Sequence, residues 1–187
     1  MKAFLLSATA IAFLAATSAT TPAHGARITI GSTLARTCYE AAEALRATPE
    51  SRRTCDLAIA EEGLSHDDLT GTYVNRGIIW MLSGDLDQAD RDYDRAIALD
   101  SNEPEAWLNK GINALKRGDS PLALQLVDRA IELRTRKPAV AFYMRGIAHE
   151  EAGNVRAAYA DLQRARALDP KWPLPAVELQ RYRLRTR

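Results

Sequence analysis

The chain contains the same short segment three times at nearly constant intervals. Each copy places a glycine four residues after an aromatic residue, and the pairs are Tyr73 and Gly77, Trp107 and Gly111, and Phe142 and Gly146. The copies lie 34 and then 35 residues apart. Self-similarity at a fixed period of this size indicates stacked supersecondary units rather than one globular core.

Each copy has the pattern of two helices separated by a tight turn. The turns are predicted at Gly84-Asp85, Gly118-Asp119 and Gly153-Asn154. Glycine can end a helix in the left-handed conformation, and Asp or Asn can cap the helix that follows. Because a single helical hairpin cannot bury both of its apolar sides, neighbouring hairpins must stack. The pattern therefore predicts an all-α solenoid of helix-turn-helix units.

The three copies resemble the tetratricopeptide repeat, a helix-turn-helix unit with aromatic, glycine, alanine and proline residues at fixed offsets. The third copy carries this pattern furthest, with Phe142, Gly146, Ala158, Leu162, Ala165 and Pro170. The resemblance implies a right-handed α-solenoid whose three repeats cover residues 70–172. The implied repeats are 70–103, 104–138 and 139–172.

The copies depart from the family pattern at the residue before the first glycine. The pattern has leucine there, whereas this chain has Arg76, Lys110 and Arg145. A long basic side chain can lay its methylene groups on apolar surface while its charge stays in water.

Residues 1–25 differ in composition from the rest of the chain. Lys2 is followed by an almost unbroken apolar run and then by small residues around Ala23 and Gly25. This order is typical of a secretory signal peptide. A membrane anchor is the alternative, but the apolar run is shorter than the roughly 20 residues of a spanning helix. We predict a signal peptide over 1–25, a mature chain that begins near Ala26, and a periplasmic or secreted protein.

The two cysteines lie in two amphipathic stretches that precede the first repeat. Two cysteines in an exported chain favour a disulfide. When this segment is aligned with the first repeat, Cys55 takes the place of Tyr93 and Cys38 falls opposite it. We predict a disulfide between Cys38 and Cys55 in a degenerate helical hairpin over residues 26–69; the alternative is two buried free thiols.

The segment after the last repeat, residues 173–187, is predicted to form a C-terminal capping helix. Pro173 and Pro175 are compatible only with the opening turn of a helix. The end of this segment carries alternating arginines, which are Arg181, Arg183, Arg185 and Arg187. They could contact an anionic partner, but a solvated helix end whose cations complement the helix dipole is the simpler explanation.

The sequence offers no recognisable catalytic motif and no metal-binding motif. It lacks the nucleophile elbow, the phosphate loop and the dinucleotide fingerprint, and its three histidines share no ligand spacing. The run of Asp87, Asp90, Asp92 and Asp94 has helical spacing and suggests a solvated face. We therefore predict no catalytic residue, no cofactor and no metal.

The charge balance limits the possible partners. Without residues 1–25 the chain carries as many acidic as basic residues. A neutral chain is a poor candidate for nucleic-acid binding driven by charge. We predict no nucleic-acid partner and no membrane span in the mature chain.

The first helix of each repeat carries two apolar stripes, whereas a surface helix needs only one. One stripe faces the second helix of the same repeat. The other stripe either seals neighbouring repeats together or faces the concave groove, which in tetratricopeptide proteins commonly holds an extended peptide or a helix. Asparagines beside this stripe can bond a peptide backbone as donor and acceptor. The candidate partner-binding residues are Val74, Asn75, Ile78, Leu108, Asn109, Ile112, Tyr143 and Ile147.

These predictions lead to one main functional hypothesis. The protein is expected to be an exported protein–protein interaction module or adaptor that binds a peptide or helix of an unidentified partner protein. A structural, self-associating solenoid is the alternative, and an enzyme with an unrecognised site is a weaker one.

Overall fold

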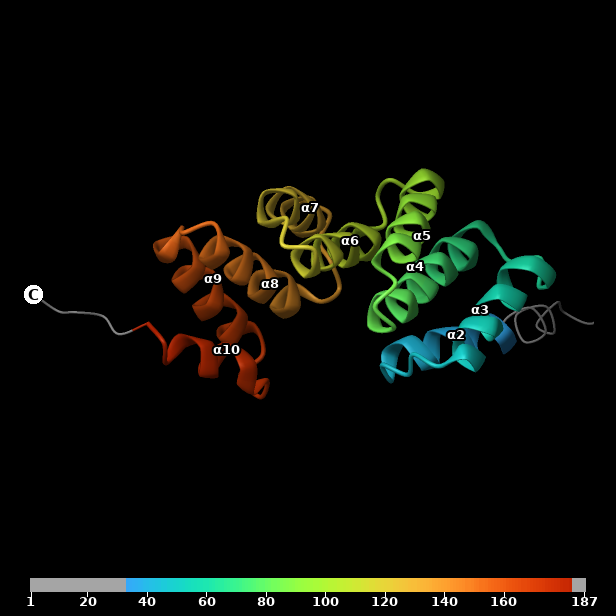
Figure 1. Cartoon of the computed structure of the whole chain (residues 1–187), viewed down its shortest axis with the longest axis horizontal. Coiled ribbons are helices and arrows are strands. Elements are labelled where there is room, and N and C mark those ends of the chain that lie inside the picture. Colours follow the sequence, from blue (N-terminus) through green and yellow to red (C-terminus); the bar gives the residue numbers. More distant parts are fainter. Residues whose placement is uncertain (1–32, 183–187) are drawn as a thin grey trace, which may run out of the picture.

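The computed structural model of the protein describes residues 33–182, so the predicted signal peptide and the last five residues of the predicted C-terminal helix lie outside the described residues. Within this range the regular elements are all helices. They are α2 (Thr33–Glu43), α3 (Pro49–Glu61), α4 (His66–Leu82), α5 (Leu86–Leu99), α6 (Pro104–Lys116), α7 (Ser120–Glu132), α8 (Pro138–Glu151), α9 (Val155–Leu168) and α10 (Pro173–Leu179). Consecutive helices pair as hairpins, and the hairpins stack into the curved array of Figure 1. The structure confirms the predicted all-α solenoid.

The turn inside each repeat is formed as the glycine pattern predicts. Gly84, Gly118 and Gly153 have φ angles of +85°, +78° and +78°, a region that side chains disfavour. Asp85 and Asp119 then cap α5 and α7 through their side chains. The third turn differs, because Asn154 precedes α9 without a side-chain capping bond.

The glycines in the middle of α4, α6 and α8 allow the two helices of each repeat to approach closely. Each lies against a side chain sixteen residues later, and these pairs are Gly77 with Tyr93, Gly111 with Val127, and Gly146 with Leu162. A Cβ atom at Gly111 would lie only 2.7 Å from Cγ2 of Val127. A side chain at Gly77 or Gly111 would therefore force its neighbour to shift, and at Gly146 it would make a tight contact with Leu162.

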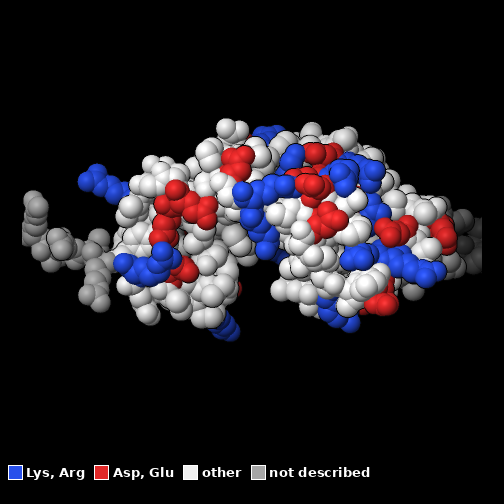
Figure 2. Space-filling view, viewed as in Figure 1, with Lys and Arg blue, Asp and Glu red and all other residues white. Residues whose placement is uncertain are grey.

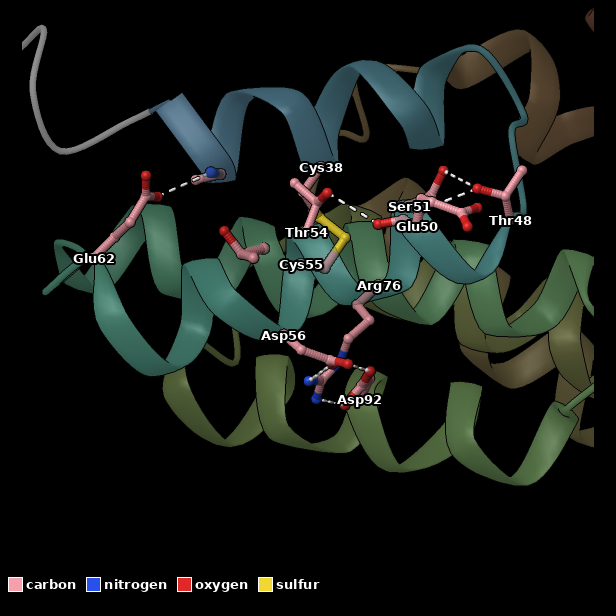
Figure 3. Close-up of a disulfide and its surroundings, with 12 residues drawn as sticks. Cys38, Thr48, Glu50, Ser51, Thr54, Cys55, Asp56, Glu62, Arg76 and Asp92 are labelled. Carbon is pink, nitrogen blue, oxygen red and sulfur yellow. Dashed lines mark hydrogen bonds and ion pairs between the residues drawn. A yellow bond between two sulfur atoms is a disulfide. The ribbon is translucent and has the colours of Figure 1, made fainter.

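The predicted disulfide joins α2 to α3, as Figure 3 shows. The Cα atoms of Cys38 and Cys55 are 5.0 Å apart, and both residues are fully buried in a cluster with Ala41 and Ile79. Since Ile79 belongs to α4, the disulfide-linked hairpin is packed directly on the first full repeat. The prediction of a disulfide is confirmed, and the alternative of two free thiols is excluded for the described residues.

The last helix, α10, begins at Pro173 and is held against α8 and α9 by aromatic and polar contacts. The ring centroids of Trp172 and Tyr143 are 4.9 Å apart. Tyr182 donates a hydrogen bond of 2.9 Å to Oε2 of Glu150, and burial together with this bond raises the pKa of Tyr182 to about 12. Arg181 donates to the other oxygen of Glu150 at 2.6 Å, so this arginine is paired rather than free.

Candidate partner-binding face

The first helices of the repeats lie side by side and form one continuous face. In the chain's packing α4 contacts both α2 and α6, and α6 contacts α8. Figure 1 shows α5 and α7 on the outer side of the curve, with α4, α6 and α8 nearer its hollow side. Figure 2 shows that the hollow opens between the two halves of the molecule. This face is the concave surface predicted from the sequence.

The eight candidate residues divide into two groups by burial. Val74, Leu108 and Tyr143, which occupy equivalent positions in the three repeats, are buried. Val74 packs with Ala96 and Ala106, so it contacts both its own repeat and the next. These three residues therefore take part in packing between helices. Only the partly exposed candidates could contact a partner.

The partly exposed apolar candidates are three isoleucines at equivalent positions. Ile78 packs against the cluster around the disulfide, Ile112 packs against the cluster around Leu108, and Ile147 packs against the cluster around Tyr143. Ile78 also packs against the cluster of Val74, Ala96 and Ala106, and Ile112 against that of Met81, Ala89 and Tyr93. Both therefore also join neighbouring units, and all three isoleucines stay partly exposed. These three residues of α4, α6 and α8 are called the apolar row below.

Two asparagines accompany this row. Asn109 donates one hydrogen bond of 2.8 Å from Nδ2 to the carbonyl oxygen of Glu105 in its own helix, which leaves its second N–H and its Oδ1 available. No partner for the Asn75 side chain is found among residues 33–182, and both asparagines are partly exposed. An amide side chain in this state can both donate to and accept from a peptide backbone.

The basic residues that replace the family leucine form ion pairs between helices. Arg76 donates from Nε and Nη2 to the two oxygens of Asp92, and from Nη1 to Asp56, each at 2.7 Å (Figure 3). Asp56 lies in α3 and Asp92 in α5, so one guanidinium ties together three helices. Asp92 is therefore a buried ion-pair partner, and our prediction that it lies on a solvated face is wrong.

The third repeat reproduces this arrangement and the second does not. Arg145 bonds both oxygens of Asp161 and also Asp128, again at 2.7 Å, and these bonds, led by that to Asp161, raise its pKa. In the second repeat the shorter Lys110 pairs with Asp94 of the preceding repeat, its sole ion-pair partner among residues 33–182. Leu126 stands there at the position of Asp92 and Asp161.

A buried amide, Asn113, also went unnoticed in the sequence. Its Nδ2 donates to the carbonyl oxygen of Leu86 at 2.9 Å and to Oδ1 of Asp90 at 2.7 Å. Asn113 thus links α6 to α5 through polar contacts. This role depends on the burial of Asn113, which cannot be read from the residue type alone.

The described residues contain no cluster that would suggest a metal site. No group of three or more His, Cys, Asp or Glu side chains within residues 33–182 is arranged to hold an ion. In the same range none of the helices combines the length and the apolar character needed to cross a membrane.

Comparison with known proteins identifies the fold. No protein-family model matches the chain, and no curated protein matches it either. Solved structures do match: the tetratricopeptide domain of Arabidopsis OM64 is 22% identical over 65% of this chain and 100% of that one, with a TM-score of 0.60. MamA from Desulfovibrio magneticus RS-1 is 22% identical over 79% of this chain and 82% of that one, with a TM-score of 0.60.

Two further matches carry functional descriptions of their own. PilW, described as a widely conserved type IV pilus biogenesis factor, is 19% identical over 79% of this chain and 64% of that one, with a TM-score of 0.62. The first tetratricopeptide domain of Spaghetti (RPAP3), bound to the HSP90 peptide SRMEEVD, is 20% identical over 60% of this chain and 90% of that one, with a TM-score of 0.57. At these identities the likeness shows the fold alone: the chain has the tetratricopeptide-repeat fold.

Proposed function

We propose that this protein is a protein–protein interaction module that binds a peptide or an amphipathic helix of a partner on the face of α4, α6 and α8. The observation that carries the proposal is the apolar row of Ile78, Ile112 and Ile147, which stays partly exposed although the repeats are already packed on one another. Helices and extended peptides dock on grooves of this kind through aliphatic side chains and backbone hydrogen bonds.

The chemistry of the face favours a partner recognised by apolar side chains and by its backbone. The peptide SRMEEVD in the Spaghetti complex carries three acidic residues, whereas none of the eight candidate residues of this chain is basic. A strongly acidic peptide would find little charge compensation on these residues. We therefore infer an uncharged or weakly charged segment whose backbone is met by Asn75 and Asn109.

We also propose that the protein is exported to an oxidising compartment and has no catalytic role. Two observations support export: the signal-like composition of residues 1–25 and the buried disulfide, which is typical of secreted and periplasmic proteins. Mass spectrometry of protein taken from its native source tests this. We expect a chain that begins near Ala26 and no thiol that reacts with an alkylating agent; an intact Met1 end in the cytoplasm would contradict the proposal.

The binding face is tested with the double variant Asn75→Ala and Asn109→Ala. The partner is first isolated by cross-linking and pull-down with the wild-type chain, and its affinity is then measured by calorimetry. Each lost hydrogen bond costs about 0.5–1.5 kcal/mol, so the double variant should bind about 5- to 150-fold more weakly. Its melting temperature should stay unchanged, because both side chains are partly exposed.

Asn154→Ala is the matched control, because Asn154 is exposed and lies in the turn before α9. It should bind as the wild-type chain does. A partner that binds the double variant and the wild type equally well would place the site elsewhere. Ile112→Ser tests the alternative that the row only seals the repeats, since it should then unfold the protein rather than weaken binding.

A further inference from the structure

One ion pair connects parts of the molecule that are far apart along the chain. Lys137, the N-cap residue of α8, donates from Nζ to Oε1 of Glu43, the last residue of α2, at 2.6 Å. The two residues are 94 positions apart. In the stack α2 packs on α3 and α4, whereas α8 packs on α6, α7 and α9. The pair therefore joins the first and the fourth helix of the row α2, α4, α6 and α8, and Figure 1 shows these two helices on opposite sides of the hollow.

Neither charge of this pair suits the helix that carries it. An anionic side chain at the C-terminus of a helix and a cationic one at the N-terminus both oppose the helix dipole. Helix α2 has no basic residue in its last turn, and α8 has no acidic residue in its first turn. Glu43 and Lys137 therefore compensate each other across the hollow rather than being compensated within their own helices.

The loop that carries Lys137 is held in place by the second repeat. Oγ1 of Thr135 donates to Oε2 of Glu105 at 2.8 Å, and the backbone N–H of Arg136 donates to Oε1 of the same carboxylate at 2.7 Å. Thr135 and Glu105 are buried, and Oγ1 of Thr135 accepts a hydrogen bond from the Lys137 N–H. Lys137 is thus fixed to the half that contains α6 to α10, whereas Glu43 belongs to the half that contains α2 to α5.

The two halves meet where α6 packs on α5, and this junction differs from its neighbours. Arg76 and Arg145 are each held by a buried aspartate of their own repeat and also reach the preceding unit. Lys110 takes their place at the junction of α5 and α6, where it pairs with Asp94, which is 59% exposed. No buried aspartate holds Lys110, because Leu126 stands at that position. The guanidinium groups are fixed before they reach the neighbouring unit, and the ammonium group is not.

The other polar contacts of this junction also permit movement. Arg117 of α6 pairs with Asp87 and Asp90 of α5, whose side chains are 74% and 31% exposed. Pairs this open to water contribute little and are screened by salt. Asn113 is fully buried between the two helices, yet its Oδ1 accepts no hydrogen bond from residues 33–182. A buried acceptor without a donor costs free energy, and water would supply the donor if the junction opened.

We propose that the two halves rotate about the junction of α5 and α6, and that the pair of Glu43 and Lys137 holds the concave face in its narrower, closed form. Hinged closure requires a pliable junction and a contact that exists in only one of the two states. Asn75 lies on one half and Asn109 on the other, so the spacing between these two partner-binding candidates depends on the pair. This consequence for binding rests on the proposed function, whereas the hinge itself does not.

The test measures the distance between the halves in the full chain without any partner. Spin labels are attached at Arg53→Cys in α3 and Gln163→Cys in α9, two exposed positions on different halves. Since the native cysteines are bonded to each other, only these two positions react. Pulsed electron paramagnetic resonance then gives the distribution of distances between the labels.

Lys137→Glu, made in the labelled chain, should raise the population of long distances at least about twofold. An exposed ion pair shifts an equilibrium by up to about fivefold, and the reversed charge also repels Glu43. The charge swap Glu43→Lys with Lys137→Glu should restore the distribution of the parent chain. The control is Lys171→Glu, which reverses an exposed lysine that has no ion-pair partner among residues 33–182; its distances should not change. The parent chain should also open as salt rises from about 0.02 M to about 0.5 M.

Three results would overturn the proposal. They are distances that Lys137→Glu leaves unchanged, a charge-swapped chain that stays as open as Lys137→Glu, and a parent chain whose distances do not respond to salt. Circular dichroism checks the fold, and Lys137→Glu should melt no lower than the parent chain because glutamate suits a helix N-terminus. Should it unfold, Lys137→Gln removes the charge alone, and unchanged distances in that variant would exclude the hinge. A partner that binds elsewhere would leave every one of these distances as expected, so the proposed function and the hinge fail separately.

Discussion

The ion pair between Arg145 and Asp161 gives the sharpest test of what holds the repeats together. Arg145→Leu restores the residue type of the family pattern but leaves the carboxylate of Asp161 without its bidentate partner. The two side chains are only 22% and 10% exposed, and removing one member of a buried pair typically costs 3–5 kcal/mol. Because Arg145 keeps some contact with water, we expect the free energy of unfolding to fall by about 3 kcal/mol. This corresponds to a fall in melting temperature of about 6–12 °C.

The double variant Arg145→Leu with Asp161→Leu separates the cost of an unpaired charge from the value of the pair. Replacing a buried ion pair by apolar residues is often neutral or stabilising, so the double variant should be at least as stable as the wild type. Urea denaturation gives the free energy of unfolding of the wild type, of Arg145→Leu and of the double variant. Arg129→Leu, which breaks a surface pair with Glu132, is the control and should change stability by less than about 1 kcal/mol. A double variant as unstable as Arg145→Leu would refute this reasoning.

Two further predictions concern the packing of the hairpins. Gly111→Leu should destabilise the protein by about 1–3 kcal/mol or more, because Val127 leaves no room for a side chain. The control Gly71→Ala, which has open space around it, should be neutral or stabilising. Equal melting temperatures of the two variants would mean that the α6–α7 contact is misassigned. Replacing Cys38 and Cys55 together by Ser should lower the free energy of unfolding by about 2–4 kcal/mol, as measured by chemical denaturation. A double variant as stable as the wild type would show that the hairpin does not depend on its disulfide.

The fold could be predicted because its determinants are local and repeated. The glycines, alanines and aromatics recur at a fixed period, and each fixes a turn or a close helix contact within one hairpin. The disulfide followed from the same alignment, since Cys55 occupies the place of Tyr93. The start of α4 is also set locally, because Ser65 accepts a hydrogen bond from the Asp68 N–H and caps the helix at His66.

The candidate site was harder to predict because burial depends on neighbouring repeats. Val74 and Ile78 lie one turn apart on one helix, yet only Val74 is buried. The partners of the basic residues were missed for a related reason. Arg76 pairs with Asp56 and Asp92, which lie on two different helices. The sequence did hold one indication of these pairs: an aspartate stands fifteen residues after Gly77 and after Gly146, but not after Gly111.

This unequal distribution of charge has a consequence for how the chain folds. Tandem repeats of similar sequence can mispair during folding, with a first helix docking on the second helix of the wrong repeat. Here an exchange with the second repeat would place Arg76 or Arg145 against Leu126, where no carboxylate can receive the guanidinium. It would also place Lys110 beside a buried aspartate without the bidentate geometry that arginine provides. The alternation of arginine, lysine and arginine therefore distinguishes the second repeat from the first and third, which share the same arginine–aspartate pair.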